Sequence, residues 1–497
     1  MKSWDCFDTL IGRLYFNPKS IFYIVANKIN DQSFVAKRID AEKRSTKKTY
    51  EDIYNYLPGY DPNVELDTEL EYSFPIRHNF DAVSDGDIIV SDMYLNSEQI
   101  EKILRYHGLN KNIKIYSSYD GKYTGSIWNN IKSNHSIDYH IGDNLKSDII
   151  QARRSGINSI FFPGKIFTYA ENLIKNYSLN LAYLVRMMRL LNPYFQNRSH
   201  WIHDNGSFFH LFAAQWLEET NGRINFLKLN KLNNQSITLT NNNIIIDLYQ
   251  DRAVSNFNQN LYTGQWHRYN SMITERNDHK SFWNDQAQYN IPILVGISKI
   301  LPQKSKLIFC QRDCLYLQKI YNSINNKNYN MLDVSRASYN QPYNKEYEDY
   351  ILDITKDCLI VDSHGSGKSS YSFFNKYNIK NKLIHICLHK NYENPLYESI
   401  FYDIIFNCND QNCLGRLFEK FNIPNIGPII NFQNNLIVRD ICEHDTFICN
   451  VQESCIDLCC KYLKYYSDIE PNKILVEKLL NLMHKSYTNF AVKSIDK

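Results

Sequence analysis

The chain of 497 residues is too long for one ordinary hydrophobic core, so two or three domains are expected. With 56 basic against 53 acidic residues and a formal net charge of +3, its balance does not fit a nucleic-acid-coating protein, and we expect no nucleic-acid partner. Apolar runs such as IPILVGISKIL fall short of the roughly 18 to 20 residues that span a bilayer, which excludes a transmembrane segment and leaves a soluble protein or one bound at a membrane surface.

Cysteine usage indicates a reducing compartment. Of the twelve cysteines, Cys6 alone lies in the first 163 residues, and the others lie between Cys310 and Cys460. Their spacing does not form the paired CxxC or CxxC and HxxxH motifs of a zinc site. We therefore expect buried free thiols and a cytoplasmic protein.

In residues 1–163, strand-like runs alternate with segments of helical period. The runs are KSWDCF, GDIIVSDMY, IKIYSSY, DYHIGDN and NSIFFPG. Such alternation predicts an α/β domain with a parallel, Rossmann-like sheet and crossover helices. The charged helical insert at about residues 12–80 is expected to form a cap over the carboxyl edge of this sheet. FFPGK ends the domain, with Pro163 and Gly164 as breaking residues.

Residues 164–497 begin with a mainly helical region that extends to about residue 300. Strand–turn–helix units then resume in the segments SKLIFCQRDCLYLQKIY, YNMLDVSRASY, DCLIVDSHGSGKSSYSFF and KLIHICLHK. This pattern predicts a second α/β domain. The tail from about residue 450 again has a helical pattern.

Polar residues follow the strands of the first domain where a site would need them. A carboxylate at the end of a first parallel strand, as Asp5 is, points into the crevice where open α/β sheets bind ligands. Ser91 can donate its hydroxyl to a phosphoryl oxygen, and Lys122 can neutralise that oxygen. Asp143 and Asp148 offer the oxygen ligands that Mg²⁺ prefers. The segments therefore predict a phosphoryl-transfer site with Asp5 as its nucleophile.

Taken singly, these residues have ordinary structural interpretations. Ser91 would be a strand-end residue, Lys122 a solvated surface charge, and Asp143 a turn residue. Their occurrence in this order, each after a predicted strand, favours a shared site. Asp92 and Asn144 are interpreted as supporting residues.

The four segments together resemble the haloacid dehalogenase superfamily, most of whose members are Mg²⁺-dependent phosphatases that form an aspartyl-phosphate. WDCFDTL matches the nucleophile loop, VSDMYL the Ser/Thr motif, Lys122 the lysine motif and GDNLKSD the acidic motif. The resemblance implies that Asp5 attacks phosphorus while Mg²⁺, Ser91 and Lys122 stabilise the charge of the transferring group. It also implies that the backbone carbonyl of Phe7 joins Asp5, Asp143 and Asp148 as a metal ligand.

The nucleophile loop departs from the usual pattern at Phe7. Phosphatases of the superfamily usually carry their acid/base aspartate two positions after the nucleophile, whereas here Asp8 comes one position later. Dehalogenases of the superfamily have an aromatic residue there, so carbon–halide chemistry stays open. The pattern DxFDTL with SDMYL looks like a subgroup often fused to polysaccharide-making enzymes. We predict a phosphatase with Asp8 as the acid/base, the alternative for Asp8 being a loop-capping carboxylate.

The segment CLIVDSHGSGKSSYSFF places a Gly/Ser loop between a strand and a helix. A nucleotide P-loop would need glycine where the chain has Asp362, so a Walker-type ATP site is not expected. The loop can still hold a phosphate through its backbone N–H groups, and Asp362 can bond a sugar hydroxyl. The residues expected to contact the ligand are Ser363, His364, Gly365, Ser366, Gly367, Lys368 and Ser369.

An acid after a strand and a Gly/Ser loop opening a helix resemble the site of phosphoribosyltransferases, which bind phosphoribosyl pyrophosphate. Those enzymes usually show two adjacent acids, whereas Ser363 stands at the second position, and the loop here is one residue shorter. Arg312 and Asp313 follow one neighbouring strand, and Ser335 and Arg336 follow the next. Arginines at strand ends suit a pyrophosphate, although Arg312 and Asp313 could instead form a local ion pair.

The whole chain is similar to bifunctional phosphoribosyltransferase and phosphoribosyl-phosphatase proteins that install β-ribofuranose in bacterial surface polysaccharides such as O-antigen or capsule. The resemblance implies transfer of 5-phosphoribose to a glycan acceptor, expected to be lipid-linked, followed by removal of the 5-phosphate. Asp362 would hold the ribose hydroxyls, and Asp313 is the first candidate for the base. Two alternatives stay open, namely a phosphatase fused to a noncatalytic glycan- or partner-binding module, or to a nucleotide-sugar glycosyltransferase.

Overall fold

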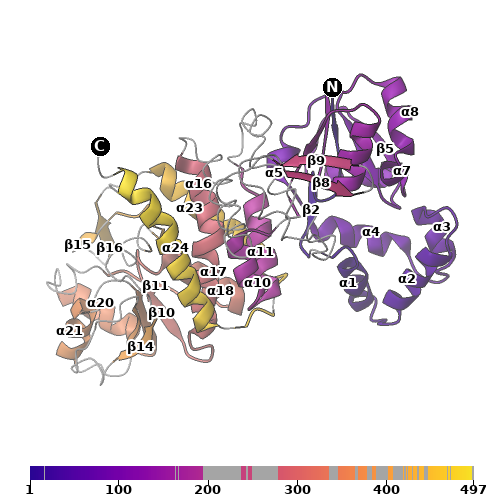
Figure 1. The fold of residues 1–497 in the computed structure, drawn as a ribbon. Coiled ribbons are helices and arrows are strands. Elements are labelled where there is room, and N and C mark those ends of the chain that lie inside the picture. The colour runs from indigo at the N-terminus through magenta and orange to yellow at the C-terminus, as the bar shows by residue number, and fades with distance from the viewer. Residues whose placement is uncertain are drawn as a thin grey trace. The chain divides into compact units, whose positions relative to one another are not determined.

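The chain folds into two compact units, each with its own parallel sheet (Figure 1). The computed structural model describes residues 1–15, 17–162, 164–165, 167–193, 237–241, 244–248, 278–334, 345–363, 368–377, 383–387, 401–406, 418, 421–422, 424–427, 429–433, 436–440, 446–466, 468–470 and 472–494. The first unit comprises Met1–Tyr169 and Leu190–Arg276, and the second comprises Ala170–Arg189 and Asn277–Lys497. The parallel sheets with crossover helices confirm the predicted α/β class, while the domain boundary after residue 163 stays a prediction.

The first unit is built on a five-stranded parallel sheet in the order β5-β4-β1-β6-β7. Its strands are β1 (Lys2–Trp4), β4 (Ile88–Asp92), β5 (Lys114–Ser118), β6 (Tyr139–Gly142) and β7 (Ser159–Phe161). The chain adds β4 and β5 on one side of β1 and then crosses to β6 on the other. Ligands of open parallel sheets bind at the carboxyl ends of the strands where the order reverses in this way, which here is between β1 and β6.

Helices connect these strands, and a separate group is inserted before β4. The connecting helices are α5 (Arg77–Phe80), α6 (Ser97–Tyr106), α7 (Gly121–Thr124), α8 (Ser126–Asn134), the π-helical turn η1 (Leu145–Ile150) and α9 (Gln151–Arg154). The inserted elements are β2 (Ile11–Arg13), α1 (Ser20–Lys28), α2 (Phe34–Arg44), α3 (Tyr50–Asn55), α4 (Pro62–Glu71) and β3 (Ser73–Pro75). Strands β8 (Ile237–Asn241) and β9 (Ile244–Leu248) form an antiparallel pair.

Helix α6 shows how local sequence specifies these elements. Asn96 and Gln99 form a capping box, in which each side chain accepts a hydrogen bond from the backbone N–H of the other residue. Ile100, Ile103 and Leu104 recur at helical spacing and are buried. The helix therefore begins at its capping residue, Asn96, and buries the face that carries its apolar residues.

The inserted helices contact the loop that follows the carboxyl end of β4. The N–H of Tyr50 in α3 donates to the carbonyl of Tyr94 over 2.8 Å, and the two rings stack. Arg13 of β2 forms a buried two-pronged ion pair with Glu69 of α4, at 3.0 Å for the closest atoms. The Tyr50 contact places the helical insert beside the loop at the carboxyl edge of the sheet (Figure 1), and the Arg13–Glu69 pair joins two elements of the insert to each other.

The second unit contains another five-stranded parallel sheet, in the order β11-β10-β12-β13-β14. Its strands are β10 (Leu307–Cys310), β11 (Met331–Leu332), β12 (Leu359–Ser363), β13 (Leu383–Cys387) and β14 (Phe401–Ile405). The order reverses between β10 and β12, which makes their carboxyl ends the expected ligand site of this sheet. Apolar side chains such as Ile308, Leu332 and Ile360 form the core beneath it.

Helices surround this second sheet, and a β-hairpin packs beside it. The helices are α10 (Tyr169–Lys175), α11 (Leu179–Leu190), α16 (Asp278–Asp285), the π-helical turn η3 (Gln286–Asn290), α17 (Ile291–Ile300), α18 (Leu315–Asn325), α20 (Lys345–Thr355), α21 (Lys368–Lys376), α23 (Thr446–Leu463) and α24 (Lys473–Ser494). The hairpin consists of β15 (Ile429–Gln433) and β16 (Leu436–Arg439). Phe432 of this hairpin belongs to the same core as Ile308 and Ile360.

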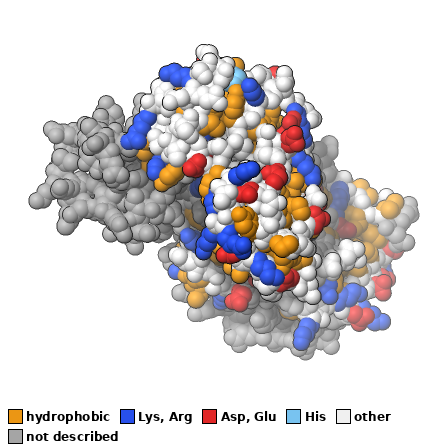
Figure 2. Space-filling view, turned by 90° about the vertical axis from the view of Figure 1, so that its right-hand side faces the viewer, with side chains coloured by type: hydrophobic (Ala, Val, Ile, Leu, Met, Phe, Trp, Pro, Cys, Tyr) orange, Lys and Arg blue, Asp and Glu red, His pale blue; other side chains and the backbone are white. Residues whose placement is uncertain are grey.

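The described surface and helices agree with the composition. Within the described part of the chain, none of the helices combines the length and the hydropathy that crossing a bilayer requires. Figure 2 shows basic and acidic side chains interspersed over one face, as nearly balanced charge predicts. The cysteines whose side chains are described carry free thiols, and all of them except Cys460 are buried.

Candidate active site

The first loop after β1 positions Asp5 at the point where the strand order reverses. The N–H of Asp5 donates to the carbonyl of Ile141 in β6 over 2.8 Å, which extends the pairing of the two strands. The chain then turns tightly at Asp8, whose φ of 59° is unusual for a residue other than glycine. Gly164 packs against this turn so closely that a Cβ there would lie 2.6 Å from the carbonyl oxygen of Asp8.

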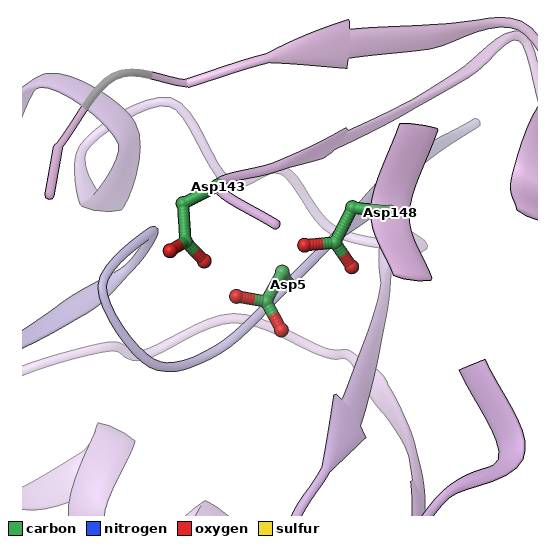
Figure 3. Close-up of side chains that lie close together, drawn as sticks. All are labelled: Asp5, Asp143 and Asp148. Carbon is green, nitrogen blue, oxygen red and sulfur yellow. The ribbon is translucent and has the colours of Figure 1, made fainter. Parts of the chain in front are cut away.

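Two further aspartates meet Asp5 from β6 and from the turn that follows it. Asp143 comes directly after β6, and Asp148 lies in η1, where the N–H of Asn144 donates to its Oδ2 over 2.9 Å. The Asn144 side chain also caps the first turn of η1. One oxygen of each of Asp5, Asp143 and Asp148 lies within 4.8 Å of the others, and Figure 3 shows the carboxylates directed toward a common point.

Lys122 connects two of these carboxylates. Its Nζ donates to Asp5 Oδ1 and, over 2.6 Å, to Asp148 Oδ1. Asp92, at the end of β4, accepts the backbone N–H groups of Lys122 and Tyr123 over 2.7 Å each, and so holds the start of α7. The supporting roles that the sequence suggests for Asp92 and Asn144 therefore have a structural counterpart in these backbone contacts.

Burial and charge act in opposite directions in this cluster. Burial raises the pKa of Asp5 and of Asp143, while Lys122 and Lys165 respectively oppose the shift. Burial also acts to raise the pKa of Asp148, but the contacts with Lys122 and His140 together outweigh it and the pKa is lowered. Burial likewise disfavours the charge of Lys122, yet Asp148 and Asp5 keep its pKa raised. Asp148 and Lys122 therefore form a charged pair, and a cation bound beside Asp5 and Asp143 would favour their charged forms.

The residues fit a hard divalent cation. Four carboxylates, those of Asp5, Asp8, Asp143 and Asp148, share two ammonium groups. Carboxylate oxygens are the ligands that hard divalent ions prefer. The buried triad could thus hold a metal ion.

The other predicted residues of this domain lie close by. Ser91 is buried near the carboxyl end of β4, the strand that pairs with β1. The Phe7 ring lies under the Arg13 guanidinium at 4.2 Å, and Asp8 lies 3.7 Å from the Lys165 ammonium. The loop from Asp5 to Asp8 thus brings one carboxylate to the triad and a second carboxylate to its rim.

Three residues of the site escaped the sequence analysis. Thr9 Oγ1 lies 3.1 Å from Asp5 Oδ2 and 3.4 Å from Asp143 Oδ1, and Lys165 Nζ lies 2.6 Å from Asp143 Oδ2. His140 lies 3.3 Å from Asp148 Oδ1 through Nε2. Thr9 and Lys165 could have been found, because one lies in the nucleophile loop and the other follows the last strand of the same sheet.

In the second unit, the described candidates lie at the ends of the neighbouring strands β10 and β12. The Ser363 hydroxyl donates to the carbonyl of Asp313 over 3.0 Å, and the Cys314 thiol lies 3.4 Å from the Ser363 hydroxyl. The Ser370 hydroxyl donates to Asp362 Oδ2 over 2.5 Å. Arg312 has a φ of 71°, a strained value for arginine that is more frequent at functional sites.

Several predicted contacts of this second site lie outside the described residues. These are Ser335, Arg336, His364, Gly365, Ser366 and Gly367. Lys368 and Ser369 begin α21, but their side chains are also outside the description.

The structure adds Arg439 of β16 to this edge of the second sheet. Its guanidinium bonds Gln311, which follows β10, and Asp333, which follows β11. It also donates to the carbonyl of Gly427 over 3.1 Å. Sequence reasoning had no signal for Arg439, because it comes from a hairpin more than a hundred positions along the chain from either partner.

Comparisons with known proteins do not assign this chain to a family. No model of a known protein family matches it, and no curated protein matches it significantly.

Proposed function

We propose that the first unit is an Mg²⁺-dependent phosphatase with Asp5 as its nucleophile. The observation that carries this proposal is the position of the Asp5 carboxylate, which lies between the Lys122 ammonium and the carboxylates of Asp143 and Asp148. A nucleophile beside a cation site and a fixed ammonium group suits a phosphoryl group, whose oxygens carry negative charge.

The residues divide the reaction into two steps. In the first, Asp5 forms a bond to phosphorus, the ester P–O bond breaks, and protonated Asp8 gives its proton to the leaving oxygen. In the second, Asp8 takes a proton from water, which attacks the aspartyl-phosphate and releases phosphate and Asp5. Lys122 and Ser91 neutralise and orient the phosphoryl oxygens. Mg²⁺ held by Asp5, Asp143, Asp148 and the Phe7 carbonyl would supply additional charge stabilisation.

The same loop leaves carbon–halide chemistry as the alternative, because Phe7 takes the usual position of the acid/base. Displacing a halide from carbon does not require a divalent cation. The buried aspartate triad is therefore better explained by phosphoryl transfer.

We further propose that the second unit is a phosphoribosyltransferase acting on a glycan. What supports this is that the Arg312–Asp313 and Asp362–Ser363 segments end adjacent strands and contact each other through Ser363. Arg312 would bind the pyrophosphate of phosphoribosyl pyrophosphate, and Asp362 the ribose hydroxyls.

In this reaction the acceptor hydroxyl forms a bond to the anomeric carbon while the bond to pyrophosphate breaks. Asp313 is the candidate that takes the hydroxyl proton, and a carboxylate nearby stabilises the positive charge that develops on the ribose. The first unit would then remove the 5-phosphate, so the chain would install β-ribofuranose on a lipid-linked glycan in the cytoplasm. The products would be precursors of a surface polysaccharide.

Asp5→Asn tests the phosphatase. The variant should lose hydrolysis of a phosphoribosyl glycan and should accumulate that compound when it is given donor, acceptor and Mg²⁺. Asp85→Asn, which changes an exposed carboxylate of the same unit, is the matched control and should hydrolyse normally. Release of phosphate by Asp5→Asn at the normal rate would refute the assignment.

Asp362→Ala tests the transferase. Losing a carboxylate that holds the ribose costs about 2 to 4 kcal/mol in transition-state stabilisation, or roughly 30- to 1000-fold in rate. The control is Asp353→Ala, an exposed carboxylate on α20. If neither the unaltered protein nor any variant binds phosphoribosyl pyrophosphate, the second unit is better explained as a noncatalytic binding module. If it binds a nucleoside diphosphate instead, a nucleotide-sugar glycosyltransferase is favoured.

A further inference from the structure

Lys165 occupies the rim of the first site in a way that differs from Lys122. Its Nζ lies 2.6 Å from Asp143 Oδ2 and 3.7 Å from Asp8 Oδ2. The Lys165 side chain is 33% exposed, whereas that of Lys122 is 2% exposed. Lys165 therefore has access to solvent and two carboxylates within reach.

The position of Lys165 follows from the loop that carries it. Gly164 approaches the carbonyl of Asp8 so closely that no larger residue fits there without movement. This contact fixes the start of the Lys165 side chain beside the nucleophile loop.

An ammonium and a divalent cation at the same carboxylate repel each other. Asp143 Oδ2 holds Lys165, and Asp143 is also one of the three residues whose oxygens could bind a metal ion. Lys122 binds the other two, Asp5 and Asp148, but it is buried and its backbone is held by Asp92. Of these two lysines, Lys165 is the one with an exposed side chain and with a partner outside the triad.

We propose that Lys165 and the divalent cation compete for Asp143. Lys165 thereby lowers the cation affinity of the site. This inference rests on the metal site of the proposed phosphatase and adds a residue that controls it.

The test is calorimetric titration of the full-length protein with Mg²⁺ alone, at constant pH and ionic strength. Lys165→Met should bind Mg²⁺ at least about tenfold more tightly than the unaltered protein, because an opposite charge in contact changes the proton affinity of a carboxylate by roughly 1 to 3 pKa units. Lys165→Arg keeps the charge and should bind with nearly unaltered affinity. The control is Lys102→Met, which removes an exposed lysine of the same unit that pairs with Asp67.

The outcomes separate this inference from the proposed function. Unchanged or weaker binding by a folded Lys165→Met protein would overturn the competition while leaving the metal site intact. Equal tightening in Lys102→Met would also overturn it, because the effect would then come from net charge alone. Absence of Mg²⁺ binding in every variant would overturn both the competition and the metal site.

Discussion

Replacing Gly142 by alanine is expected to displace Asp148 from the first site. Gly142 ends β6, and a Cβ there would lie 2.5 Å from both the Cβ and the Oδ2 atoms of Asp148. Asp148 has little freedom to yield, because Lys122 holds it at 2.6 Å and the N–H of Asn144 at 2.9 Å. The added methyl group must therefore distort the strand end or break the Asp148 contacts.

The magnitude follows from these two possibilities. Overpacking a buried site costs about 1 to 3 kcal/mol, and separating a buried ion pair such as Lys122 and Asp148 costs about 3 to 5 kcal/mol. We expect Gly142→Ala to lose about 2 to 5 kcal/mol of unfolding free energy, between the two estimates. Because Asp148 belongs to the triad, Mg²⁺ affinity should also fall, by about 10- to 100-fold.

Urea denaturation and Mg²⁺ titration of the same samples measure both effects. The control is Gly59→Ala in the inserted helices, where a Cβ would meet no atom within 4 Å but the φ of 87° is unfavourable for alanine. Gly59→Ala should lose about 1 to 2 kcal/mol of unfolding free energy and should bind Mg²⁺ with unaltered affinity. Unaltered stability and unaltered Mg²⁺ binding in Gly142→Ala would refute the close packing of Gly142 on Asp148.

Two further predictions concern stability. Glu69→Ala leaves Arg13 buried without its partner and should lower the free energy of unfolding by about 3 to 5 kcal/mol in urea denaturation. Glu71→Ala on the same helix removes an exposed partner of Lys28 and should lower it by less than about 1 kcal/mol. Equal losses in the two variants would contradict the difference between the buried and the exposed pair. Burial lowers the pKa of His107 to about 4, so below its ordinary value of about 6.5 the unfolded chain takes up the proton first and stability falls. After allowance for the partial exposure of His107, the free energy of unfolding should fall by about 1 to 2 kcal/mol between about pH 7 and pH 5. This fall should be absent in His107→Gln.

Much of the first site could be predicted because its polar residues lie at the carboxyl ends of predicted strands. Asp5, Lys122 and Asp143 each come after a predicted strand, and the carboxyl ends of parallel strands meet at one edge of a sheet. The apolar runs and the alternation with helical segments were enough to predict the parallel sheet of the first unit and the α/β class of the second. For the same reason the second unit could be outlined, with Asp313 after one strand and Asp362 near the carboxyl end of the next.

Only the tertiary structure decided which of these strand ends are neighbours and what else reaches them. The reversal of strand order places β1 beside β6 and β10 beside β12, and order in a sheet depends on long-range packing that no local pattern records. Lys165 and Arg439 acquire their partners through loops and hairpins distant in sequence. The left-handed backbone of Asp8 and Arg312 is imposed by surrounding contacts, because neither residue type requires it. Local sequence thus determined which residues could act, and long-range packing determined which of them meet.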